Sequence, residues 1–265
     1  MEMEKIKLYS IYTDENSILK DFFLKSIQDD WEVKISYWGN AGEGGGSGFT
    51  LGWYNILRKR IGFLLDKIKE NWGKIIIWSD IDIQFFGKCS GLISKSIIDK
   101  DIIFLSEHWP KKEVNGGFYV MRCNTKTHLF LESVLQTKIE ELPRGDQTAM
   151  NDILKANIIG IKWDILPRQF WAMSHGWPPP INLVLHHANC TRPQIRNGST
   201  IGSLEQKIEQ LERVRKYVTL HKEWKWLFYV PDQTFFILRY FKNILSALKG
   251  RIKNNKNMPD FSEKG

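Results

Sequence analysis

Two aspartates one residue apart, Asp80 and Asp82, are the side chains of this sequence best suited to metal chemistry. They lie in the stretch Lys74–Gly87, which reads KIIIWSDIDIQFFG. Two carboxylates this close repel each other unless a cation lies between them, and their hard oxygen atoms favour Mg²⁺ or Mn²⁺. An isolated pair of this kind is more often a solvated acidic turn. Because these two acids interrupt a mostly apolar run, we expect a metal site instead.

Other polar residues lie near the ends of predicted elements and could join the same site, and one of them, Asn115, begins a Gly-rich turn that leads into a predicted strand. Asn115 offers both a donor and an acceptor, and the two glycines after it permit close approach of the backbone to a ligand. Asp146 follows a helix break and is expected to cap the next helix. His186 and His187 end a short predicted strand. Adjacent residues of a strand point to opposite faces, so at most one of these histidines can bind the metal.

The elements around the aspartates predict an open α/β sheet. The β-branched run Ile75–Trp78 is typical of a strand buried on both faces. Strands over Lys5–Tyr12 and Trp31–Trp38, with a helix over Ile18–Ile27 between them, predict a parallel pair with a right-handed crossover. Ligands of such sheets bind at the carboxyl ends of the strands, and the first strand would end at the same edge as Asp80.

A Gly-rich stretch and a basic cluster are not matched by the sequence to a particular binding site. Gly39–Gly48 fits no phosphate-binding loop pattern, so it predicts a mobile surface loop or, alternatively, a lid over a ligand. The helix expected over Phe49–Trp72 carries Arg58, Lys59 and Arg60. Three consecutive residues of a helix cannot face one ligand. We expect one of them to reach a phosphate while the others stay in solvent.

The composition is that of a globular α/β protein with anionic partners. The chain has 265 residues, 42% hydrophobic and 26% charged, with 11 tryptophans, a net charge of +8 and a pI near 9.2. Tryptophan suits the apolar faces of sugars, although most will lie in the core. Cys89, Cys123 and Cys190 are too dispersed for a disulfide framework or a zinc site, which favours a reducing, cytoplasmic location. Neither a signal peptide nor a membrane-spanning apolar run is expected.

The character of the sequence changes near residue 200, which predicts two parts, 1–200 and 201–265. Leu204–Leu220 is an amphipathic helix with charges on one face. Phe235–Ile252 combines large apolar residues with four basic ones, as in helices that lie on anionic membranes; a helix packed on the protein is the equal alternative. Asn254–Gly265 predicts a disordered tail.

Four motifs in a fixed order resemble those of the nucleotide-diphospho-sugar transferase family, relatives of retaining galactosyltransferases and glycogenin. They are WSDID at Trp78–Asp82, NGGFYVMR at Asn115–Arg122, GDQTAMN at Gly145–Asn151 and HAN at His187–Asn189. The resemblance covers residues 1 to about 200. It implies the α/β GT-A fold, a Rossmann-like, mixed but mostly parallel sheet flanked by helices, here with a helical, basic C-terminal extension.

The resemblance also implies roles for individual residues. The metal ligands would be Asp80, Asp82 and His187, with His186 as the alternative. The donor would contact Tyr12, Thr13, Asp80, Asn115, Gly116 and Gly117, and the catalytic residues would be Asp146 and Gln147. The glycine and lysine that usually follow the histidine motif are matched only loosely by Arg192, Arg196 and Gly198, which leaves the diphosphate-binding base unassigned.

The implied activity is a metal-dependent glycosyl transfer with Mn²⁺ or Mg²⁺. The donor would be a nucleoside-diphosphate sugar, UDP by preference, and the acceptor a hydroxyl of a glycan, glycolipid or glycoprotein, with retention and without nucleic acid. A peripheral contact with an anionic membrane is a further expectation. Three alternatives are a sugar nucleotidyltransferase, a dehalogenase-type phosphatase and a glycan- or nucleic-acid-binding module. A sugar nucleotidyltransferase normally has a basic Gly-rich signature after the first strand. A binding module would leave Asp80 and Asp82 without a role.

Overall fold

The computed structural model describes residues 5–43, 48–172, 179–180, 182–189, 194–196 and 199–223. Residues Met1–Leu220 form one compact unit, and residues His221–Gly265 form a second. Outside the described residues lie the predicted interfacial helix over 235–252, the tail over 254–265, residues 44–47 of the Gly-rich stretch, Arg192 and Gly198. No helix in the described part of the chain is long and apolar enough to cross a bilayer.

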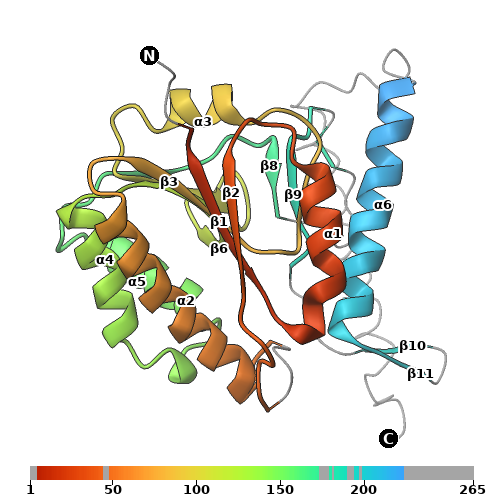
Figure 1. The fold of residues 1–265 in the computed structure, drawn as a ribbon, viewed down its shortest axis with the longest axis horizontal. Coiled ribbons are helices and arrows are strands. Elements are labelled where there is room, and N and C mark those ends of the chain that lie inside the picture. The colour runs from red at the N-terminus through yellow and green to blue at the C-terminus, as the bar shows by residue number, and fades with distance from the viewer. Residues whose placement is uncertain are drawn as a thin grey trace, which may run out of the picture. The chain divides into compact units, whose positions relative to one another are not determined.

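A six-stranded sheet with the order β2-β1-β3-β6-β5-β7 forms the centre of the first unit (Figure 1). Its strands are β1 (Lys7–Tyr12), β2 (Glu32–Tyr37), β3 (Ile75–Ser79), β5 (Ile102–Ser106), β6 (Val114–Arg122) and β7 (Trp163–Ile165). All pairings are parallel except those of β6, which runs antiparallel to both β3 and β5. The strands are apolar on both faces because helices cover both of them.

Helices cover the two faces of this sheet, so the unit has three layers. The side chains of Trp78, Tyr119 and Phe104 enter one core with the helices α2 and α4, whereas Ile77 and Phe118 enter the other core with α1. The bounds are α1 (Ser17–Ser26), α2 (Leu51–Glu70), α3 (Ser90–Ser96), α4 (Thr125–Gln136) and α5 (Asp146–Ala156). The alternation of core contacts along each strand follows from its two-residue side-chain period.

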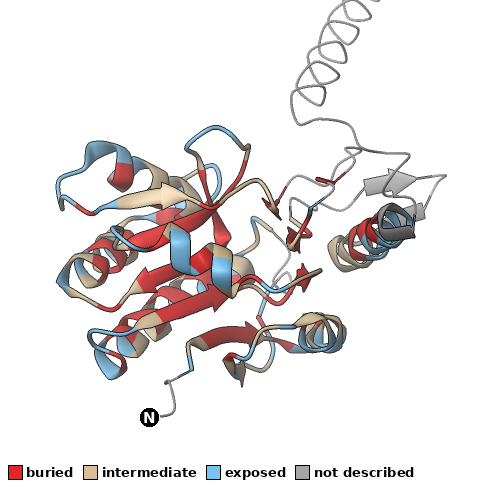
Figure 2. Cartoon of the chain, turned by 90° about the horizontal axis from the view of Figure 1, so that it is seen from above, coloured by how far each residue is buried: buried red, intermediate tan, exposed pale blue. Residues whose placement is uncertain are grey.

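A small second sheet and the last described helix complete the unit beside α1 (Figure 1). The sheet has the order β4-β9-β8, with β4 (Ile83–Phe85), β8 (Phe170–Trp171) and β9 (Leu185–His187). Helix α6 (Ser203–Glu223) turns a buried side toward the unit and an exposed side outward (Figure 2). Leu211 joins the second core, and Val214 packs with Trp171 of β8. The helix predicted over Leu204–Leu220 is confirmed, and its apolar stripe is buried against the unit.

The predicted fold class is confirmed: the sheet is mixed but mostly parallel, with helices on both faces. Helix α4 ends at Gln136, and a separate 3₁₀ turn over Ile139–Glu141 follows it. Asn157 adopts a left-handed conformation at the end of α5, before the short strand β7. One local prediction was wrong. Asn115 and its glycines lie within β6 rather than in a turn before it.

Candidate functional site

The two aspartates leave the sheet at the carboxyl end of β3, where the main chain turns toward the small sheet. The Asp80 amide donates to the Gly117 carbonyl of the neighbouring strand β6 at 2.7 Å. The Ala188 amide donates to the Asp82 carbonyl at 3.0 Å and joins this turn to the end of β9. Backbone bonds to two different sheets thus fix both aspartates, and the Asp82 side chain is buried while that of Asp80 is 29% exposed.

Strand register brings His187 to the aspartates and turns His186 away. In the antiparallel pair β4-β9, Ile83 faces His187 and Gln84 faces His186. His187 therefore lies beside Asp82, whereas the His186 ring lies in the core and stacks on Trp171 with ring centroids 5.4 Å apart. Burial lowers the pKa of His186 to about 3, so this imidazole is neutral.

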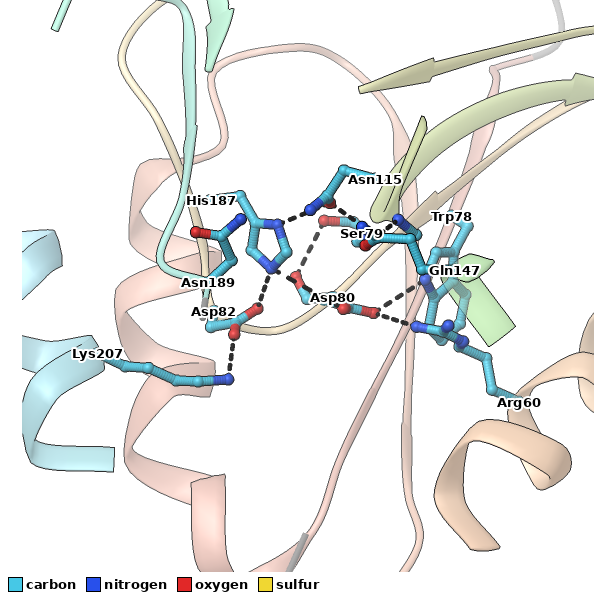
Figure 3. A network of polar contacts seen from close by, with 12 residues as sticks. Arg60, Trp78, Ser79, Asp80, Asp82, Asn115, Gln147, His187, Asn189 and Lys207 are labelled. Atoms are coloured by element: carbon cyan, nitrogen blue, oxygen red, sulfur yellow. Dashed lines mark hydrogen bonds and ion pairs between the residues drawn. The ribbon is translucent and has the colours of Figure 1, made fainter. Parts of the chain in front are cut away.

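Asp80, Asp82 and His187 each offer one ligand atom, and these atoms lie within 4.8 Å of one another (Figure 3). His187 Nε2 lies 3.2 Å from Asp82 Oδ1 and 4.0 Å from Asp80 Oδ2. Asp82 Oδ1 is buried and accepts no hydrogen bond within the described structure. Two carboxylates and an imidazole, with one buried oxygen left without a hydrogen bond, fit a divalent cation such as Mn²⁺ or Mg²⁺.

Asn115 fixes the proton of His187 on the nitrogen that faces away from the aspartates. The Asn115 side-chain amide nitrogen donates to Glu107 Oε2 at 2.5 Å, and its Oδ1 accepts from the Gly117 amide at 2.9 Å. This Oδ1 also lies 2.9 Å from His187 Nδ1, which must therefore be the donor. In the neutral imidazole, Nε2 then carries the lone pair and points it at Asp80 and Asp82, as a metal ligand would.

Gly117 leaves the space that the His187 ring occupies. A Cβ atom at this position would lie 2.2 Å from His187 Cε1 and 2.6 Å from Nδ1. No side chain larger than hydrogen fits there without displacing the imidazole. The glycine predicted to approach a ligand closely thus closely approaches a side chain of the site itself.

The carboxylates of the site face two cations, Arg60, which is buried, and Lys207, which is 28% exposed. Burial opposes the charge of Asp82, but Lys207 and His187 outweigh it and hold its pKa below the ordinary value. Burial raises the pKa of Asp80, although Arg60 acts in the opposite direction. Burial also works against a charged His187, yet the adjacent Asp82 carboxylate raises its pKa. The pocket thus concentrates positive charge against two carboxylates.

Arg60 corrects the prediction made for the basic cluster on α2. Its guanidinium is 5% exposed, bonds to Asp80 Oδ1 at 3.0 Å and forms a short ion pair with Asp146. Its cationic carbon also lies 5.6 Å from the centre of the Trp78 ring. Arg58 instead forms an ion pair with Glu140 at the surface. None of these contacts was predicted, although position 60 falls on the apolar face of the helix at helical spacing.

Asp146 is the first residue of α5, and its N-cap is Gly145, so the capping role predicted for the aspartate was wrong. The Asp146 carboxylate pairs with Arg60 instead and is buried. The next residue, Gln147, accepts a bond from the Gly116 amide through Oε1 at 3.4 Å. This bond joins the start of α5 to β6, and Gln147 lines the same cavity as Asp80, Asp82 and His187.

Two adjoining cavities meet at Asp80 and Asp82. The first, of about 590 Å³, is lined by Asn115, both glycines, Asp146, Gln147 and His187. The second, of about 620 Å³, is lined by Thr13, the start of α1, Trp78 and the first residues of α6. Tyr12 does not line either cavity; its ring packs against Tyr37, with centroids 5.2 Å apart. Volumes of this size suit small-molecule ligands.

Two residues that the sequence analysis did not select also line the first cavity. Lys207 of α6 forms a short ion pair with Asp82 (Figure 3), and Glu107, buried after β5, accepts from Asn115 and from Asn189. Lys207 lies 125 residues from its partner, and no motif connects the two. Glu107 had a usable signal, since it is a carboxylate directly after a buried strand that ends at this sheet edge.

Comparisons with known proteins agree with this geometry. A sequence profile of the nucleotide-diphospho-sugar transferase family matches residues 50–197. No curated protein matches the sequence. Among solved structures, the apo form of the glycosyltransferase GlyE from Streptococcus pneumoniae TIGR4 is similar, with 10% identity and a TM-score of 0.52. That match covers 83% of this chain and 64% of GlyE, so this chain spans less than two thirds of that protein.

A second similar structure is a glycosyltransferase involved in the glycosylation of the major capsid of PBCV-1, with 10% identity and a TM-score of 0.51. That match covers 80% of this chain and all of the other. At these identities the likeness shows the fold. The profile, by contrast, spans more than half of the sequence and includes the Asp80, Asp82 and His187 positions. The chain belongs to the nucleotide-diphospho-sugar transferase family, and the prediction of a glycosyltransferase is confirmed at the level of this family.

Proposed function

We propose that this chain transfers a sugar from a nucleoside-diphosphate sugar, UDP by preference, to a hydroxyl group of a glycan, glycolipid or glycoprotein. The observation that carries the proposal is the group of Asp80, Asp82 and His187 where the two cavities meet. A donor laid across this point would have its nucleoside in the second cavity and its sugar in the first. Thr13 would contact the nucleoside, while Asn115 and the glycines of β6 would border the sugar.

Asp80, Asp82 and His187 would hold a divalent cation, Mn²⁺ or Mg²⁺. When bound, such a cation supplies positive charge to the diphosphate leaving group without a proton transfer. Asn115 orients His187 for this purpose, and Glu107 orients Asn115. Lys207, which pairs with Asp82, would provide further positive charge near the diphosphate and take the place of the base that the family motif leaves unassigned.

Transfer with retention is proposed from the resemblance of the motifs to those of retaining galactosyltransferases, and the residues at the start of α5 bear on its route. The bond between the anomeric carbon and the diphosphate oxygen breaks, a bond to the acceptor oxygen forms, and the acceptor proton passes to the departing diphosphate. Asp146 is held by Arg60 and is a poor nucleophile in that ion pair, and Gln147 carries no nucleophilic charge. Attack by the acceptor hydroxyl on the face that the diphosphate leaves is therefore the proposed route, with Gln147 supporting the positive sugar from the other face.

The test is a panel of UDP- and GDP-sugars, assayed for release of the nucleoside diphosphate with Mn²⁺, Mg²⁺ or EDTA. We expect one donor to be hydrolysed slowly in a metal-dependent way, and Asp80→Asn and Asp82→Asn to abolish the release. Asp99→Asn is the matched control, because Asp99 is 70% exposed, forms an ion pair with the neighbouring Lys100 and lines neither cavity. Full activity in both site variants would refute the assignment.

A further inference from the structure

An aromatic wall formed by Phe49 and Trp53 borders the first cavity. The two ring centroids lie 5.2 Å apart, and Phe49 is 41% exposed. Phe49 also has a φ angle of 73°, a conformation that bulky residues rarely adopt. A large ring held at a cavity mouth by an unfavourable backbone conformation is better explained by a ligand than by core packing.

Trp53 connects this wall to the residues proposed to contact the donor sugar. A Cβ atom on Gly145 would lie 3.0 Å from Trp53 Cη2, so the indole packs directly on the turn before Asp146 and Gln147. Gly145 itself has a φ angle of 55°, which favours glycine. Trp53 lines both cavities, whereas Phe49 lines only the first. Phe49 therefore lies on the sugar side of the site, away from the proposed nucleoside cavity.

The same cavity also carries planar polar groups, which come from the loops after β5, before α5 and after β9. Glu107 is buried, and Arg144 lies 3.7 Å from it and 2.9 Å from Glu113. Asn189 donates to Glu107 at 3.4 Å. Carboxylate, guanidinium and amide groups bind hydroxyls, whereas indole and phenyl rings pack on the C–H face of a sugar. An apolar lipid chain would match the aromatic wall but would desolvate the charged groups without replacing their hydrogen bonds.

We propose that the aromatic wall is the acceptor subsite and that it binds a hexopyranose ring, the terminal sugar of a glycan acceptor. One C–H face of that ring packs on Phe49 and Trp53, and its hydroxyls reach Arg144 and Glu107. The proposal rests on the proposed function for the donor side but assigns residues and a ligand class that the donor site does not require. Loss of the Phe49 ring should weaken acceptor binding about 10-fold or more.

The test is saturation-transfer NMR with a panel of methyl hexopyranosides and disaccharides, recorded with UDP and the diamagnetic Mg²⁺ present. We expect at least one saccharide to bind through the protons of a single ring face. Phe49→Ala should weaken that binding at least about 10-fold, while Phe49→Tyr, which keeps the ring, should retain it. Leu51→Ala is the matched control, because Leu51 is 56% exposed, lies two residues away and does not line the cavity.

Calorimetric titration with UDP separates the two proposals. Unchanged UDP binding in Phe49→Ala, with saccharide binding lost, supports the acceptor subsite. Equal saccharide binding in Phe49→Ala and wild type overturns it, and so does a wild-type protein that binds UDP but no saccharide of the panel. If the wild type binds a saccharide through Phe49 but binds no nucleotide, the donor assignment fails and the aromatic wall stands as a sugar site.

Discussion

Replacing Arg60 by methionine is expected to destabilise the fold by about 3 kcal/mol. Its guanidinium is 5% exposed and bonds to Asp80 and Asp146. Removing one partner of a buried ion pair typically costs about 3–5 kcal/mol, because the remaining charge is left without compensation. Asp146 is 3% exposed and bears this cost fully, whereas Asp80 is 29% exposed and can be hydrated, which favours the lower end of the range.

Urea unfolding at pH 7, followed by far-UV circular dichroism, measures this loss. In a chain of this size, a loss of about 3 kcal/mol in the free energy of unfolding corresponds to a decrease in Tm of roughly 6–12 °C. Arg58→Met is the control, because the Arg58 side chain is 34% exposed and its ion pair with Glu140 is worth about 1 kcal/mol or less. The double variant Arg60→Met/Asp146→Asn should recover part of the loss, since it removes the stranded charge. A cost below about 1 kcal/mol for Arg60→Met, or additive effects in the double variant, would refute the reasoning.

Three further predictions concern single contacts. Gly117→Ala should abolish Mn²⁺-dependent UDP binding in calorimetry, because its Cβ would lie 2.2 Å from the His187 ring. Asn115→Leu should weaken the binding of Mn²⁺ about 10- to 100-fold in a calorimetric titration, since His187 loses the hydrogen-bond acceptor that orients its ring. Arg58 lowers the pKa of Glu140 from 4.5 to about 2, so this carboxylate stabilises the fold above pH 4.5 and loses that effect as the pH falls to 2. Glu140→Gln should therefore cost about 0.5 kcal/mol in urea unfolding at pH 7 and nothing at pH 2.

Matched variants keep these predictions specific. Gly116→Ala is the control for Gly117→Ala, because its Cβ would meet only the tip of the Arg60 side chain at 3.4 Å and a carboxylate oxygen at 4.0 Å. Glu141→Gln is the control for Glu140→Gln, because Glu141 is 69% exposed and contacts Lys138 at 3.2 Å. Equal effects of a variant and its control would contradict the contact on which that prediction rests.

The sequence predicted the sheet and its ligand edge well, because those features follow from local patterns. The apolar run before Asp80 is typical of a buried strand, and the β-α-β start predicts that the first two strands are parallel neighbours, as β1 and β2 are. The alternation of side chains along a strand also implied that His186 and His187 point to opposite faces. The register of β4 and β9 confirms this. The choice between them depended on a strand pairing that no local pattern encodes.

The cations of the site could not be derived in the same way. The sequence analysis expected Arg60 to reach solvent or a phosphate. Its two acidic partners lie 20 and 86 residues away along the chain, so no local pattern pointed to them. Lys207 was part of a segment considered separate from the site, although it pairs with Asp82. Both cases follow one physical rule: a buried carboxylate needs a cation, but the rule names neither the residue nor the element that supplies it.

The most direct test of the account is a calorimetric titration of UDP into the protein with Mn²⁺ and, in parallel, with EDTA. Wild type and Asp99→Asn should bind UDP in a Mn²⁺-dependent way. Asp82→Asn, which keeps the shape of the side chain but removes its charge, should lower that affinity at least about 100-fold, because it removes a buried metal ligand and not a surface charge. Equal UDP affinity in Asp82→Asn and Asp99→Asn, with or without Mn²⁺, would contradict the assignment of this site.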